Sequence, residues 1–200
     1  MKGVQFYMQS EKQTYKNNLY VVLIPGGKVL KLTKNLQKKI SGYYKIYEKG
    51  SYPQIHITIN KVEKKHEKDL TNIIDRAIKH WNKKIEIAIE DFDCYFTEKN
   101  RFLVLKISRT RTLVEFSELL QQKLINSGIN TINNYNRWNY HITLISSLFA
   151  ENQINYKDFT ELCILFKDLN FCPVSSEVQQ LEIWRPVLDK TNKIIKKYFL

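Results

Sequence analysis

The chain has 200 residues, 43% of them hydrophobic and 26% charged, which is the balance of a soluble globular protein able to bury one core. Its formal net charge of +12 favours an anionic partner such as RNA or an oligonucleotide, although a lysine-rich solvated surface alone would give the same balance. Because there is no membrane-length apolar run, and no signal-peptide core in residues 1–16, we expect a cytoplasmic protein without a membrane partner.

The first half of the chain alternates between strand-like and helix-like patterns. Residues 19–25 form a short apolar strand candidate, and the apolar residues of 29–40 then keep helical spacing up to a stop at Gly42. Residues 55–62 predict the next strand. Residues 64–81 predict a helix with one apolar stripe on a basic body.

The next elements predict a hairpin followed by a helix. Residues 85–96 and 101–108 are strand candidates on either side of a loop at 97–100. The helix is expected to start near Thr112, with Glu115 completing a capping box, and to end at Gly128.

The C-terminal part is less uniform in pattern. Residues 154–171 fit a helix, yet the apolar run within them fits a buried strand equally well. Residues 178–187 and 193–200 predict a final antiparallel hairpin around a turn at 189–192.

A short phrase occurs twice, as His56-Ile57-Thr58-Ile59 and as His141-Ile142-Thr143-Leu144, 85 residues apart. In a strand, each copy places its imidazole and its hydroxyl on one face and its aliphatic side chains on the other. Two imidazoles can supply both an acid and a base near neutrality, and a hydroxyl beside each can hold an anionic oxygen. This set suits in-line displacement at phosphorus and requires no metal or cofactor.

On these two motifs the chain resembles the 2H phosphoesterase superfamily, which is named for paired His-x-Thr/Ser motifs. The resemblance implies an α+β fold with two lobes related by a pseudo-twofold axis. Two antiparallel sheets would surround a central cleft with the helices outside, and residues 1–200 would form one domain. Neither motif follows the proline that is common in the family, because Ile55 and Tyr140 stand there instead.

Carried over by position, the resemblance makes His56 and His141 catalytic and makes Thr58 and Thr143 the hydroxyls that bind the phosphate. The family's usual assignment gives the acid role to the first histidine and the base role to the second. The implied activity is a metal-independent phosphodiesterase that cleaves RNA ends with a 2′,3′-cyclic phosphate, or short 2′-5′ or 3′-5′ oligonucleotides, linear or cyclic. The alternative is a protein of the same fold that binds RNA or a nucleotide without turnover.

The remaining chemistry-bearing residues give weaker signals. His66 and His80 lack a threonine partner or metal-ligand spacing, so we expect them to be solvated or to flank a helix. The odd cysteine count, without CxxC spacing, predicts buried, reduced thiols at Cys94, Cys163 and Cys172. We also expect a monomer, in which Tyr135, Arg137 and Trp138 are candidates for stacking on bases.

Overall fold

The computed structural model describes residues 17–47, 52–96, 100–132, 135–147, 150–167, 173–187 and 190–200. Its elements, in chain order, are β1 (Asn18–Pro25), α2 (Gly27–Tyr44), β2 (Ile57–Glu63), η1 (Lys64–His66), α3 (Glu67–Lys79), β3 (Glu86–Phe96), β4 (Arg101–Ile107), α4 (Arg111–Asn126), η2 (Tyr135–Arg137), β5 (His141–Ser146), α5 (Tyr156–Lys167), β6 (Val174–Trp184), α6 (Lys190–Lys193) and β7 (Ile194–Phe199). The expectations for residues 1–16, for the loop at 97–99, and for Cys172 and Asp189 lie outside the described residues.

The seven strands form one antiparallel sheet in the order β2-β1-β6-β3-β4-β5, with β7 also paired to β6. The long strand β6 joins the two halves, because its first residues, from Val174 to Glu177, pair with β3 and its later ones pair with β1 and β7. The α+β class and the antiparallel pairing are therefore confirmed, and the two halves share a strand.

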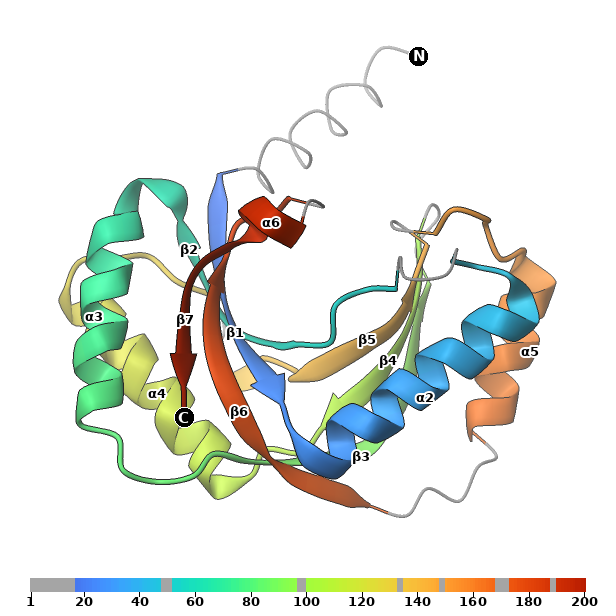
Figure 1. Cartoon of the computed structure of the whole chain (residues 1–200), viewed down its shortest axis with the longest axis horizontal. Helices are drawn as coiled ribbons and strands as arrows, with labels where there is room; N and C mark the ends of the chain where they lie inside the picture. The colour runs from blue at the N-terminus through green and yellow to red at the C-terminus, as the bar shows by residue number, and fades with distance from the viewer. Residues whose placement is uncertain are drawn as a thin grey trace, which may run out of the picture.

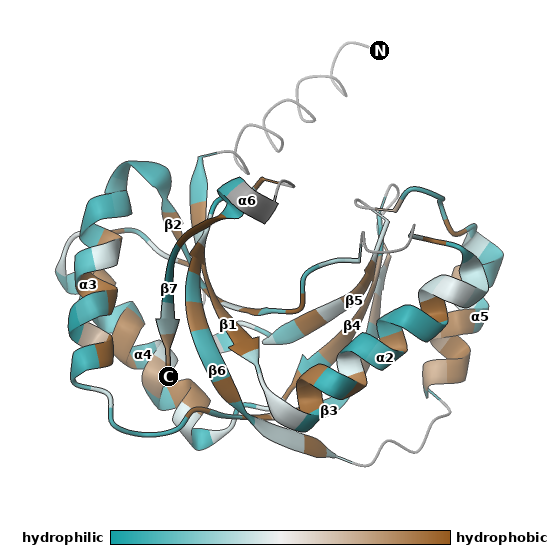
Figure 2. Ribbon diagram, viewed as in Figure 1, coloured by the Kyte–Doolittle hydropathy of each residue, from teal (hydrophilic) through white to brown (hydrophobic). Residues whose placement is uncertain are grey.

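Helices α2, α3, α4 and α5 cover the outer side of a strongly curved sheet (Figure 1). Helices α3 and α4 lie outside the half that contains β1 and β2, whereas α2 and α5 lie outside the half that contains β4 and β5. Helices α3, α4 and α5 each bury a mainly apolar face, as α3 does with Leu70, Ile73, Ile74 and Ala77. Figure 2 shows hydrophobic residues recurring along the strands and the helices.

The segment that fitted both a helix and a strand is the helix α5, which begins at Tyr156. Phe159, Leu162, Cys163 and Phe166 are buried at three- and four-residue spacing, while Ile164 and Leu165 are more than half exposed. The run from 162 to 166 is therefore not buried on all sides, as an interior strand would be. On the buried face, Phe166 packs against Phe92 of β3, with ring centroids 4.5 Å apart.

Cys94 of β3 and Cys163 of α5 form a disulfide, with their Cα atoms 6.2 Å apart. The prediction of reduced thiols was therefore wrong for these two residues. Packing of α5 on β3 brings together cysteines that lie 69 residues apart in the sequence. No local spacing reveals such a contact.

We expect the chain, purified without reductant and denatured, to titrate as one free thiol and, after reduction, as three, because the disulfide occupies two of its three cysteines. A colorimetric thiol assay measures both values. Cys94→Ser is the matched control, since it releases Cys163 and should raise the unreduced count to two. An unreduced count of three in the starting protein would contradict the disulfide.

Candidate functional site

Both motif copies divide their side chains between two environments, as the sequence predicts. His56 and Thr58 are half-buried, while the side chains of Ile55, Ile57 and Ile59 around them are buried. The second copy repeats this division, because His141 and Thr143 are half-buried and their neighbours Tyr140, Ile142 and Leu144 are buried. Each strand thus anchors its aliphatic face in the core and leaves one imidazole and one hydroxyl partly accessible.

The two motifs stand at the two ends of the strand order, yet the curved sheet brings these ends together. His56 immediately precedes the edge strand β2, His141 begins the opposite edge strand β5, and β2 and β5 contact each other. Trp138 closes part of the junction, because its indole Nε1 donates to the carbonyl oxygen of Thr58 at 3.0 Å. Segments 80 residues apart in the sequence therefore lie side by side at this site.

A buried amide from α2 ties the same two segments together. Gln37, which is 3% exposed, donates through Nε2 to the carbonyl oxygen of Pro53 at 3.1 Å. The same nitrogen lies 3.4 Å from the carbonyl oxygens of both Thr143 and Leu144. One side chain thus fixes the approach to the first motif relative to the backbone of the second.

The two imidazoles are oriented by the same type of hydrogen bond. His56 donates through Nδ1 to the carbonyl oxygen of Gln54 at 2.7 Å, and His141 donates through Nδ1 to the carbonyl oxygen of Asn139 at 3.0 Å. A carbonyl oxygen can only accept, so the proton of each neutral ring resides on Nδ1. The Nε2 atom of each ring is left to accept a proton, or to donate one when the ring is charged.

His56 is packed more tightly than the motif alone would suggest. Its ring centroid lies 4.5 Å from that of Trp184, and the Lys193 ammonium lies 3.7 Å above the same indole. Trp184 is itself held by Glu182, a buried carboxylate that accepts from its Nε1 at 2.6 Å and pairs with Lys197 at 3.1 Å. His56 therefore packs against a tryptophan that Glu182 holds in place and that also contacts the Lys193 ammonium.

These surroundings favour the neutral form of the His56 ring. Desolvation by burial is the main cause that lowers its pKa to about 4, the hydrogen bond to Gln54 opposes the shift, and the charges of Lys193 and His141 lower the pKa further.

We expect the His56 ring to titrate with a midpoint near 4, below its ordinary value of 6.5, because the charged ring is desolvated and faces positive charge. The pH dependence of its Cε1–H signal in an NMR spectrum measures this midpoint. Lys193→Gln should raise the midpoint, because it removes one of the repelling charges. A midpoint near 6.5 in the wild-type protein would contradict this arrangement.

Other candidates from the sequence lie outside this arrangement. Tyr135 is buried, with its hydroxyl 2.6 Å from that of Tyr140, so it serves the core and is not a stacking surface. Arg137 is exposed. His66 lies 4.0 Å from Asp69 at the start of α3, and His80 is exposed at its end, as expected.

The sequence did not reveal Gln37, Glu182, Trp184 and Lys193, which reach the site through contacts between distant segments. The clearest local signal was Glu182, a carboxylate two residues before a tryptophan in a strand candidate. Within the part of the chain that is described, no three His, Cys, Asp or Glu side chains are grouped as metal ligands, and no helix is long and apolar enough to span a membrane.

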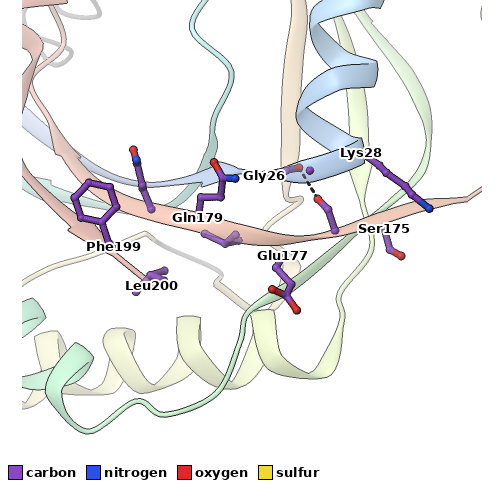
Figure 3. Close-up of a pocket in the computed structure, with 11 residues that line it drawn as sticks. Gly26, Lys28, Ser175, Glu177, Gln179, Phe199 and Leu200 are labelled. Atoms are coloured by element: carbon purple, nitrogen blue, oxygen red, sulfur yellow. Dashed lines mark hydrogen bonds between the residues drawn. The ribbon is translucent and has the colours of Figure 1, made fainter.

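A cavity of about 740 Å³ lies elsewhere, where the start of α2 meets β6 and the C-terminus (Figure 3). Gly26, Lys28, Ser175 and Gln179 contribute to its lining, and the Ser176 hydroxyl donates to the Gly26 carbonyl at 2.8 Å. None of the four motif residues lines it. The cavity is therefore not the motif site.

No protein-family model matches the chain, and no curated protein matches its sequence. Solved structures do match its fold. TT0787 of Thermus thermophilus superimposes with a TM-score of 0.58 at 13% identity, covering 92% of this chain and 97% of that one. E. coli LigT complexed with 3′-AMP gives 0.54 at 14% identity, covering 92% and 98%. Kluyveromyces marxianus Usb1 gives 0.50 at 11% identity, covering 94% and 100%.

These matches confirm the fold that the resemblance in the two motifs implied. They extend over nearly the whole chain, which agrees with an architecture that uses both halves.

Proposed function

We propose that this chain is a metal-independent phosphodiesterase in which His56 and His141 are the acid–base pair. Thr58 and Thr143 would bind the phosphate that is attacked. The observation that carries the proposal is the matched setting of the two imidazoles, since each donates Nδ1–H to the carbonyl two residues before it and leaves Nε2 for chemistry. Two such rings at the starts of two edge strands that contact each other are what a one-site acid–base mechanism requires.

The reaction is an in-line displacement at phosphorus. One imidazole accepts the proton of the attacking water or hydroxyl as the new P–O bond forms, and the other donates a proton to the leaving oxygen as the old P–O bond breaks. The two threonine hydroxyls donate to the non-bridging oxygens, where negative charge is concentrated in the transition state.

We assign the base role to His56 and the acid role to His141, the reverse of the family's usual assignment. His56 packs against Trp184 and lies near the Lys193 ammonium. Burial of the ring and the Lys193 charge both favour a neutral ring, and only a neutral ring can accept a proton. After one turnover His56 is charged and His141 neutral, so proton exchange with water resets the pair.

The proposed substrates are RNA ends with a 2′,3′-cyclic phosphate, or short 2′-5′ or 3′-5′ oligonucleotides, linear or cyclic. The net charge of +12 supports an anionic substrate, and E. coli LigT, which has the same fold, binds 3′-AMP. We propose the cytoplasm as the location. Disulfides such as Cys94–Cys163 are rare in cytosolic proteins. Cell fractionation tests the proposed location directly.

A turnover screen in the presence of EDTA tests the proposal. It compares RNA with a 2′,3′-cyclic phosphate, a 2′-5′ oligoadenylate and cyclic oligonucleotides as substrates for the wild type and for the double variant His56→Ala/His141→Ala. Cleavage that survives EDTA and is lost in the double variant supports the enzyme. Tight binding by the wild type without cleavage of any substrate would favour the sequestering protein.

Thr58→Val and Thr143→Val are each expected to lower kcat/KM about ten-fold or more. Valine keeps the shape of threonine but removes a hydrogen bond to a charged oxygen, which contributes roughly 1.5–3 kcal/mol. Steady-state kinetics on the substrate found above measure the loss. Thr58→Ser and Thr143→Ser are the matched controls, since they keep the hydroxyl and should retain most of the activity. Equal losses in the valine and serine variants would argue against phosphate binding by these hydroxyls.

A further inference from the structure

Helix α2 carries lysines without any acidic residue to balance them. The 18 residues of α2 include five lysines (Lys28, Lys31, Lys34, Lys38 and Lys39) and no acidic residue. In contrast, basic and acidic residues are equal in number within α3, within α4 and within α5. A lysine-rich composition would raise the net charge of every helix. It therefore does not explain why α2 alone, among the four longest helices, has an excess of lysines.

Three of these lysines form a stripe. At about 100° per residue, Lys31, Lys34 and Lys38 fall within an arc of roughly 60°, spread over about 10 Å of the helix. All three are exposed. None of the α2 lysines pairs with a carboxylate among the residues that the structure describes.

This arrangement disfavours the helix itself. Lys31 and Lys34, like Lys34 and Lys38, are like charges one turn apart, and such pairs destabilise a helix by a few tenths of a kcal/mol each. Lys28 stands in the first turn, where the helix dipole favours an acid, and α2 has no acid there. Helix α3 shows the favourable pattern, with Glu67 and Asp69 in its first turn. The positions of the α2 lysines therefore lower the stability of the helix. Residues that are unfavourable for folding are typical of a binding surface.

The lysine stripe lies on the exposed side of the helix whose buried side contacts the motif backbone. The buried face of the same helix carries Gln37, whose amide contacts the backbone at Pro53 and Thr143. A helix with its side chains is about 10 Å across, so the stripe begins roughly that distance from the motif backbone. Figure 1 shows α2 along the outside of the sheet half that ends in β5, and Figure 2 shows hydrophilic residues recurring along it.

We propose that Lys31, Lys34 and Lys38 bind the phosphate backbone of a single-stranded RNA whose end is held at the motif site. The inference rests on the proposed function for the identity of that end, and it extends it by making the substrate a polynucleotide longer than a dinucleotide. A row of unpaired ammonium groups complements a row of phosphates.

The test uses the triple variant Lys31→Gln/Lys34→Gln/Lys38→Gln. The matched control is Lys64→Gln/Lys68→Gln/Lys79→Gln, which removes the same charge from exposed positions in η1 and α3. Binding of a fluorescent single-stranded RNA is followed by anisotropy at several salt concentrations. Turnover is measured in parallel on that RNA and on a dinucleotide, both ending in a 2′,3′-cyclic phosphate.

We expect the α2 variant to bind the RNA about ten-fold more weakly at low salt. The slope of log Kd against log salt should fall by about two, because single-stranded contacts contribute about 0.7 each. Turnover of the dinucleotide should be unchanged, and the control should lose little. Equal weakening by both variants would overturn the proposal, because it would show an effect of net charge alone. The proposal would also be overturned if the α2 variant bound RNA like the wild type but lost binding to phosphatidylserine vesicles, because the stripe would then be a membrane-binding surface.

The outcomes separate this proposal from the proposed function. If the wild type cleaves neither substrate, the phosphodiesterase proposal fails, while the anisotropy series still decides whether α2 binds RNA. If the wild type cleaves both substrates and the α2 variant cleaves them equally well, the phosphodiesterase proposal is supported and the proposal that α2 binds RNA is wrong. The α2 variant should unfold at the same temperature as the wild type or higher, because like charges have been removed.

Discussion

Replacement of either His56 or His141 with Ala is expected to lower kcat by at least about 10²-fold, because loss of a general acid or base typically costs about 10²–10⁴. Each ring has a separate task in the displacement, so neither can substitute for the other. The double variant should not show the product of the two losses, since the rings act as a unit. Steady-state turnover of a cyclic-phosphate substrate measures all three variants.

The chain provides matched controls for this experiment. His66 and His80 are its other two histidines, and they lie at the two ends of α3. His66→Ala and His80→Ala should therefore retain wild-type kcat. Full activity in His56→Ala or in His141→Ala would contradict the assignment, whereas equal losses in all four variants would point to a general effect on the fold.

Gln37→Leu is expected to produce the second large effect. Gln37 touches no substrate in this account and positions the two motifs, because its one amide group contacts the carbonyls of Pro53, Thr143 and Leu144. Leucine fills similar space but leaves these buried acceptors without their donor, at a cost of about 2 kcal/mol in the free energy of unfolding. The motif strands are then free to shift, and a displacement of about 1 Å can lower the rate by as much as about 10²-fold.

The measurement pairs urea unfolding with kcat and KM. Thr33→Val is the matched control, because Thr33 is also buried in α2 but donates only to the carbonyl of Val29 in its own helix. It should change stability modestly and leave kcat unchanged. If Gln37→Leu were destabilised yet kept the wild-type kcat, Gln37 would be a structural residue without a positioning role.

Local patterns in the sequence predicted most of the elements. The motif strands follow from alternation, because Ile57 and Ile142 must face the core when their neighbours carry polar groups. The helix α3 follows from a single apolar stripe. Boundaries shifted where tertiary contacts decide them. Thus α2 continues past Gly42 to Tyr44, and Thr110 precedes α4 in place of Thr112, whose hydroxyl accepts from the backbone of Glu86.

The contacts that assemble the site could not be predicted from one sequence. Gln37 meets Thr143 across 106 residues, and the order of strands places β6 between β1 and β3 without any periodic signal. Lys193 and His56 both lie against the indole of Trp184, which requires the final hairpin to fold back beside β1. These pairings depend on sheet curvature and register, which a hydrophobic pattern does not encode.

In the proposed mechanism His56 and His141 act on one phosphate, and the most direct test is an NMR titration of the four imidazoles with an RNA that ends in a phosphate. We predict that the Cε1–H signals of His56 and His141 move together with the same Kd, while those of His66 and His80 stay in place. Movement of only one motif histidine, or of the two with different affinities, would contradict a shared site.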